Sequence, residues 1–193
     1  MAIAKRKKRF FDVEIPIIKK ETQLRAYEMK ELEGKYLKYD LTRFLRGKGT
    51  LMQFKVKMQD EKAIATPRKI QLLPFFLKRM VRKGTNYVED SFSTETKDAQ
   101  VRIKPFLVTR RKVSRNVRKA LRNLAKEELV NYLKENTTEV VFEDILKNKL
   151  QKELSLKLKK IYPLSLCEIR ALKIEKDLDL APKEEEKVEV KKE

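Results

Sequence analysis

Two runs of alternating apolar and polar residues, separated by a Gly-Lys-Gly turn, constrain the fold of this chain most strongly. In residues 37–42 the apolar side chains fall on every second position, and residues 52–58 repeat the pattern. Successive side chains of a β-strand point to opposite faces, so each run predicts a strand with one apolar and one charged face. Gly47 and Gly49 favour a turn between the two runs. The sequence therefore predicts a long hairpin whose apolar face packs against the rest of the molecule.

The remaining segments predict strands and helices in mixed order. Further strands are predicted at residues 11–15, 23–29, 87–94, 101–108 and 164–174, with a bulge or an edge position at Pro105. Helices are predicted at residues 73–83, at residues 114–134, and from residue 137 or 138 to just before Pro163, the last with an interruption near Asn148. This order predicts an α+β fold: a strongly curved antiparallel sheet or small β-barrel, with helices packed to one side and flexible termini.

Basic residues are concentrated in blocks that contain no acid. The 193 residues carry a formal charge of +19, and the windows 1–11, 62–88 and 99–126 hold five, seven and ten Lys or Arg residues without any Asp or Glu. A block of one sign repels itself, so an external anion is needed to neutralise it. Nucleic acid is the favoured partner, and an anionic membrane surface or an acidic protein is the weaker alternative.

Several kinds of catalytic and metal site are excluded. The chain has no His, which rules out His-based triads and His-ligated zinc, and the single Cys167 allows neither an internal disulfide nor a Cys cluster. Gly47 to Thr50 do not form a phosphate-binding loop, because Thr42 stands where that motif requires Gly. We therefore predict no catalytic residue, no metal and no cofactor. The most apolar stretch, residues 70–77, is too short to span a bilayer, so we expect a soluble, cytoplasmic protein without membrane contact.

The segment from residue 101 to residue 126 carries the most informative pattern. At 100° per residue, Arg115, Arg118 and Arg122 share one face of the predicted helix. The alternative is an ordinary solvated face, but such faces mix acids with bases, and no acid occurs here before Glu127. Arg115 and Arg118 also stand in the first turns, where the helix dipole repels a cation. An external phosphate removes both difficulties, so phosphate binding is favoured.

Three separated basic patches suit a folded RNA better than one groove of DNA. We predict a basic RNA-binding arm at residues 1–9, a single α+β RNA-binding domain at residues 10–176 and a disordered charged tail at residues 177–193. The predicted RNA-binding residues are Lys5, Arg6, Lys7, Lys8, Arg9, Lys78, Arg79, Arg82, Lys83, Arg102, Lys104, Arg110, Arg111, Lys112, Arg115, Arg118, Lys119 and Arg122. A basic DNA-binding or chromatin-type protein is the alternative, and an RNA-modifying enzyme is disfavoured because the usual catalytic groups are missing.

Three local motifs resemble one known family. They are Phe10-Phe11-Asp12-Val13 running to Pro16, Leu32-Glu33-Gly34-Lys35-Tyr36 running to Leu41, and Ile161-Tyr162-Pro163-Leu164. In this order, around the helices and the basic run, they resemble the S-three-A (S-one-e) family of small-subunit ribosomal proteins, in its archaeal type; Lys35 departs from the Arg usual there. The resemblance implies a barrel-centred structural constituent on the platform of the small subunit, near the messenger exit. Its expected partners are small-subunit ribosomal RNA, neighbouring ribosomal proteins and mRNA near the exit, in cytoplasmic ribosomes.

Overall fold

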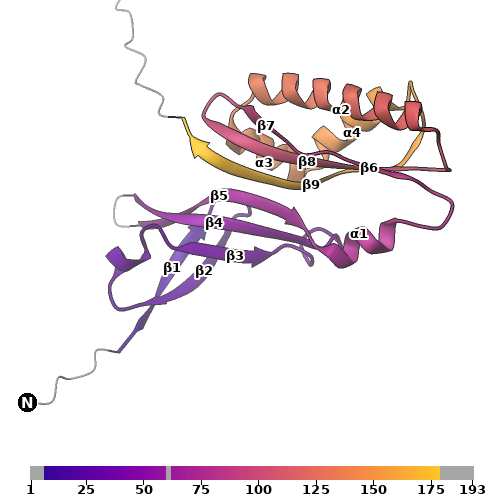
Figure 1. The fold of residues 1–193 in the computed structure, drawn as a ribbon. Helices are drawn as coiled ribbons and strands as arrows, with labels where there is room; N and C mark the ends of the chain where they lie inside the picture. Colours follow the sequence, from indigo (N-terminus) through magenta and orange to yellow (C-terminus); the bar gives the residue numbers. More distant parts are fainter. Residues whose placement is uncertain (1–6, 60–61, 179–193) are drawn as a thin grey trace, which may run out of the picture.

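The computed structural model describes residues 7–59 and 62–178 as an α+β fold built on a nine-stranded sheet (Figure 1). The predictions for Lys5, Arg6 and the tail beyond Leu178 lie outside the described residues. The strands are β1 (Arg9–Ile15), β2 (Lys20–Ala26), β3 (Tyr36–Asp40), β4 (Thr50–Gln59), β5 (Lys62–Leu72), β6 (Tyr87–Glu89), β7 (Phe92–Glu95), β8 (Ala99–Thr109) and β9 (Leu164–Asp177). The helices are the 3-10 turn η1 (Met29–Leu32), α1 (Pro74–Met80), α2 (Arg115–Glu135), α3 (Thr138–Leu146) and α4 (Lys149–Leu158).

The predicted central hairpin is confirmed. β3 and β4 are antiparallel, with Tyr39 opposite Met52. The alternate positions Met52, Phe54 and Val56 of β4 are fully buried. Gly47, in the connection, has φ of 85°, a left-handed conformation that favours glycine. The hairpin therefore has the two-faced character that its alternation predicts.

Strand β5 joins the two parts of the sheet, and no element is predicted there from the sequence pattern. One edge of β5 pairs with β4 along its whole length. The other edge pairs first with β1, in parallel, at Ala63 and Ile64, and then with β9 at residues 69–71. The described strands thus form an open, mixed sheet: the predicted α+β class is confirmed, the barrel was wrong, and the antiparallel expectation holds for every described strand pair except β1 with β5. The parallel pairing of β1 with β5 is what makes the sheet mixed.

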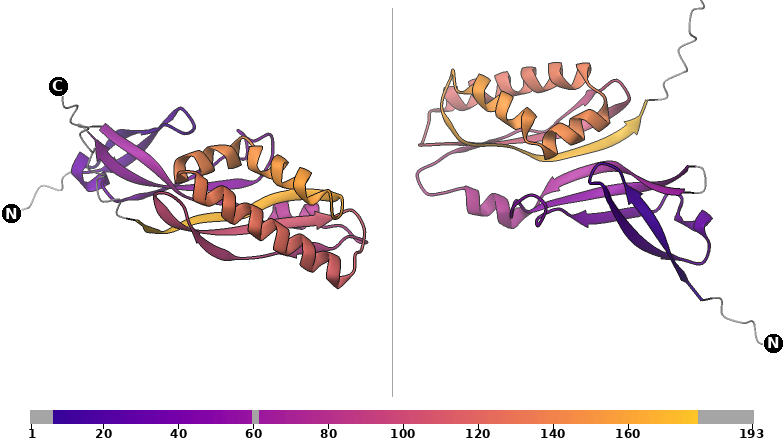
Figure 2. Two further views of the ribbon diagram at one scale, coloured as in Figure 1. Left: turned by 90° about the horizontal axis from the view of Figure 1, so that it is seen from above. Right: turned by 180° about the vertical axis from the view of Figure 1, so that it is seen from behind.

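Helices α2, α3 and α4 cover one face of β7, β8 and β9 (Figures 1 and 2). The buried face of α2 is formed by Leu121, Ala125, Leu129 and Leu133, which are four residues apart and at most 1% exposed. The interruption predicted near Asn148 is real: this residue separates α3 from α4 and has φ of 57°. Within the described residues, no helix combines the length and the apolarity needed to cross a membrane.

The other face of β8 explains the irregularity at Pro105. The register between β8 and β9 shifts between Lys104 and Pro105, which confirms the predicted bulge. Beyond it both faces of β8 are buried, because α1 packs on the face opposite α2, where Phe76 contacts a small core containing Phe106 and Val108. The expectation that the helices lie on one side therefore holds for α2 to α4 and is wrong for α1.

Some predicted boundaries also differ. The strand expected at residues 23–29 is β2, which ends at Ala26, and the single strand expected at residues 87–94 is divided into β6 and β7. A short break between β6 and β7 lies beside the bulge of β8, since Glu89 pairs with Phe106 whereas Phe92 pairs with Ile103. The break therefore follows from the same irregularity.

Candidate nucleic-acid interface

Two of the predicted basic patches come together at one end of the molecule. Helix α1 and the loop after it lie beside the start of β6, and β8 ends there before the chain turns into α2 (Figure 1). We call this surface the basic end. Its members are Lys78, Arg79, Arg82, Lys83, Arg110, Arg111, Lys112, Arg115, Arg118, Lys119 and Arg122. All are exposed except Arg118, which is half-buried.

The loop that carries Arg110, Arg111 and Lys112 is held by hydrogen bonds to Asn86, which precedes β6. The backbone N–H of Thr109 donates to the carbonyl oxygen of Asn86 (2.8 Å). The side-chain oxygen Oδ1 of Asn86 accepts from the backbone N–H of Val113 (2.9 Å), and the Thr109 hydroxyl donates to the carbonyl oxygen of Arg111 (2.7 Å). The basic loop is therefore anchored at both ends before any ligand arrives.

The first turns of α2 line a groove. Ser114 caps the helix by accepting from the backbone N–H of Val117 (3.5 Å), and the first turn contains no acid. A cavity of about 380 Å³ lies between these turns and β6. Its walls are formed by Tyr87, Val88, Arg115, Asn116, Arg118, Lys119 and Arg122. The Nε of Arg118 is buried there and has no hydrogen-bond acceptor within the described part of the chain. A buried donor without an acceptor is unfavourable, so the groove suits an incoming anion.

The basic end is not compensated by the chain's own acids. Among residues 7–59 and 62–178, none of its side chains forms an ion pair. Other cations of the chain are paired: Lys48 bonds Glu168 at 2.7 Å, and Arg170, in the cavity that Lys78 also lines, bonds Glu89 at 2.8 Å. The ammonium group of Lys48 also donates to Oδ1 of Asn148 at 2.8 Å, so it is engaged within the protein.

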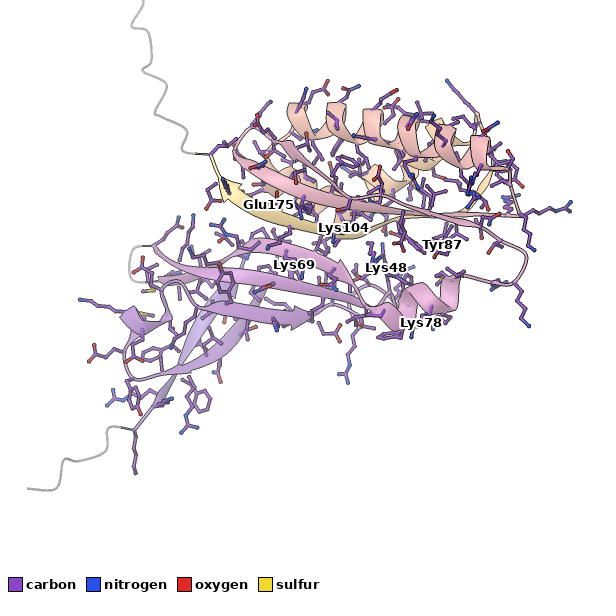
Figure 3. All side chains as sticks on the ribbon, in the orientation of Figure 1. Lys48, Lys69, Lys78, Tyr87, Lys104 and Glu175 are labelled. Carbon is purple, nitrogen blue, oxygen red and sulfur yellow. The ribbon has the colours of Figure 1, made fainter. Side chains whose placement is uncertain are left out.

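The other predicted residues lie apart from the basic end. Arg102 is already paired, with its Nε 2.9 Å from a carboxylate oxygen of Glu175. Lys104 is half-buried on the sheet face away from α2 (Figure 3). The arm residues Lys7, Lys8 and Arg9 are exposed at the start of β1, at the opposite end from α1 (Figure 2). The structure therefore gathers two of the three patches and leaves the arm as a separate one.

Tyr87 is a candidate contact that the sequence pattern does not reveal. Its ring stacks on Phe106, with 6.0 Å between the ring centroids and 26° between the planes, and the residue is 54% exposed. Figure 3 shows it between β6 and α1, where it lines a second, more apolar cavity of about 400 Å³. The sequence offered one indication of this contact: in a strand, Tyr87 must point to the face opposite its apolar neighbour Val88, which is buried. Two other aromatic residues, Tyr36 and Phe75, are also exposed, whereas Phe76 is buried.

No described group of three His, Cys, Asp or Glu side chains is arranged to hold a metal ion. The chemistry available at the basic end is therefore that of guanidinium and ammonium groups beside an exposed aromatic ring. Such groups bind phosphates through charge-assisted hydrogen bonds and can stack on bases.

Comparisons with known proteins identify a family that this chain resembles. The model of the Ribosomal S3Ae family matches residues 4–177. The small ribosomal subunit protein eS1 of Nanoarchaeum equitans is 27% identical over 183 residues, which cover 88% of this chain and 90% of the relative. The protein of the same name from Pyrobaculum arsenaticum is 27% identical over 183 residues, covering 94% and 79%. That from Methanothermobacter thermautotrophicus is 32% identical over 100 residues, covering 51% of each chain.

Proposed function

This chain belongs to the Ribosomal S3Ae family, and from that membership we propose that its basic end binds small-subunit ribosomal RNA. The chain is a structural constituent of the small ribosomal subunit rather than an enzyme. Its partners are ribosomal RNA and other ribosomal proteins. The alternative of a chromatin-type DNA-binding protein is set aside, because the relatives are ribosomal proteins of archaea.

The observation that carries the proposal is the uncompensated charge of the basic end. Within the described residues its cations form no ion pair with the chain's own acids. In addition, Arg115, Arg118 and Lys119 stand in the first turns of α2, where the helix dipole disfavours positive charge. Guanidinium groups bind phosphate in a bidentate fashion, so the Arg-rich groove of α2 fits an RNA backbone. The ring of Tyr87, beside the groove, offers a face on which an unpaired base can stack.

We also propose the finer placement that the family resemblance implies, on the platform near the messenger exit, with mRNA passing close by. Residues 1–9 would act as a basic arm that contacts RNA, residues 10–176 as one RNA-binding domain, and residues 177–193 as a charged tail. Support for the arm comes from its described part: Lys8 and Arg9 are exposed, and the Nζ of Lys8 lies 5.2 Å from the centre of the Tyr27 ring. For protein neighbours, α4 offers Leu156, which is 68% exposed.

Charge reversal in the α2 groove tests the proposal. We expect Arg115→Glu, Arg118→Glu and Arg122→Glu, made together, to abolish incorporation of the protein into small subunits, because three attractive phosphate contacts become repulsive. Acidic residues are favoured in the first turns of a helix, so the thermal unfolding temperature should not fall. The measurement is cosedimentation with small subunits in a magnesium-containing gradient.

The matched control reverses three exposed lysines away from the first turns of α2: Lys134 in the last turn of α2, Lys97, whose backbone N–H donates to the carbonyl oxygen of Asn136 just after that helix, and Lys152 in α4. This control carries the same change in net charge, and we expect it to incorporate normally. Normal incorporation of the α2 variant, or equal loss in both variants, would contradict the assignment of the basic end.

A further inference from the structure

Three basic residues stand directly opposite one another on three neighbouring strands. Lys69 of β5 is in register with Lys173 of β9, and Lys173 is in register with Arg102 of β8. Residues in register share a face of the sheet, with their Cβ atoms about 4.5–5.5 Å apart. The three side chains therefore form one continuous row, which we call the basic row.

The basic row lies on the face that α2, α3 and α4 leave uncovered. The next residues along the strands, Ile70, Leu172 and Ile103, are buried in the core, so the row must point the other way. Lys173 and Arg102 are exposed, and Lys69 is half-buried. Lys104 follows Arg102 by two positions on the same face, and Figure 3 shows Lys69 and Lys104 on the side of β8 and β9 away from α2.

Folding alone does not favour this arrangement. Like charges directly opposite in a sheet are destabilising. The charge of Arg102 is compensated, because its Nε lies 2.9 Å from a carboxylate oxygen of Glu175. Within the described residues, Lys69, Lys173 and Lys104 have no acidic partner. The same sheet does pair opposite charges elsewhere, as between Lys62 and Glu14 at 3.4 Å, so the repulsion at Lys69 and Lys173 is a local feature.

The surroundings indicate which anion fits. Phe106 follows Lys104 on the same face of β8 and stacks on the exposed ring of Tyr87. A row of cations that leads to an exposed aromatic ring suits RNA, whose phosphates can bind the cations and whose bases can stack on the ring. An acidic peptide carries no base to stack there and fits less well. Along β8, Lys104 and then Phe106 lead from the row toward Thr109, where the strand ends at the basic end.

We propose that Lys69 and Lys173, with Lys104, bind backbone phosphates of an RNA strand on the face of the sheet opposite α2, beside α1. This is a second contact, separate from the α2 groove, and it rests on the proposed function in ribosomal RNA binding. The ammonium groups of Lys69 and Lys173 stand on neighbouring strands and can bind one phosphate together. The negative charge of the phosphate then attracts both groups and offsets their repulsion.

Stability and binding should respond in opposite directions to one change. In the full chain carrying Lys69→Gln and Lys173→Gln, loss of repulsion should raise the melting temperature of the free protein by about 1–4 °C at low salt. This rise should disappear in 1 M salt, where the screening length is only about 3 Å. The same variant should bind a transcript of small-subunit ribosomal RNA more weakly, with the slope of log affinity against log salt reduced by about one to two units.

The control variant carries Lys97→Gln and Lys152→Gln, two exposed lysines outside the basic row and the basic end, and should change neither quantity. RNA affinity and salt slope equal to those of the unmodified protein would overturn the proposal, and would leave an acidic protein neighbour as the occupant of the row. A melting temperature that falls would overturn the claim of repulsion. If the unmodified protein itself fails to bind the transcript, the proposed function fails instead, so the two failures are distinguishable.

Discussion

The thiol of Cys167 shows how a single residue is set by its surroundings. Cys167 is partly buried and packs against the main core from β9. Burial, with a smaller contribution from the negative charge of Glu168, raises the pKa of the thiol to about 12. The thiolate is the reactive form, so this cysteine is kept inert at neutral pH.

We therefore expect iodoacetamide at pH 8 to alkylate Cys167 in the folded protein more than about 100-fold more slowly than in the unfolded chain, whose thiol has an ordinary pKa. The rate can be followed by mass spectrometry, with and without concentrated guanidinium. Equal rates in the two states would show that the thiol is neither buried nor held in its neutral form.

The residues of the candidate site could be predicted to different degrees. The basic side chains of α2 were identifiable because an acid-free helical face is a local pattern, readable without knowledge of neighbours. The partner of Arg102 was not, because Glu175 reaches it only through the pairing of β8 with β9. Tyr87 was missed for the same reason: its stacking on Phe106 depends on the register of β6 and β8.

At the scale of elements, the amphipathic ones were predictable and β5 was not. The hairpin of β3 and β4 and the helix α2 each bury one face, so their periodicity is visible in the sequence. β5 contains Pro67 and three basic residues, which mask its alternation. The structure tolerates Pro67 because the register with β4 shifts beside it, between Gln53 and Phe54.

The central position of β5 predicts a large effect of a small core change. Ile70 is 4% exposed and stands between Met52 of β4 and Leu172 of β9. Ile70→Ala should lower the free energy of unfolding by about 2–5 kcal/mol, because it leaves a cavity where the two parts of the sheet meet. Urea unfolding followed by circular dichroism measures the change. A decrease below about 1 kcal/mol would mean that the site collapses freely and that β5 is not a structural link.

At the scale of the whole molecule, the fold segregates charge. The sheet and α2 bring residues 78–83 and 110–122 to one end, while acids such as Glu168 and Glu128 pair with other bases. The open edge of the sheet was not foreseen, because the closure of a sheet depends on which strands pair across long sequence distances. The general chemistry of the surface was foreseen, since exposed Lys and Arg depend little on tertiary detail.

The salt dependence of RNA binding tests the central claim most directly, that cations left unpaired by folding bind ribosomal RNA phosphates. The affinity for small-subunit ribosomal RNA should be measured across a range of KCl concentrations, for the unmodified chain and for a variant with Arg115→Gln, Arg118→Gln and Arg122→Gln. We predict a steep fall of affinity with salt for the unmodified chain. For the variant we predict a shallower slope, by about one unit for each arginine that normally binds a phosphate. Identical slopes for the two proteins, or a slope near zero for the unmodified chain, would contradict the account.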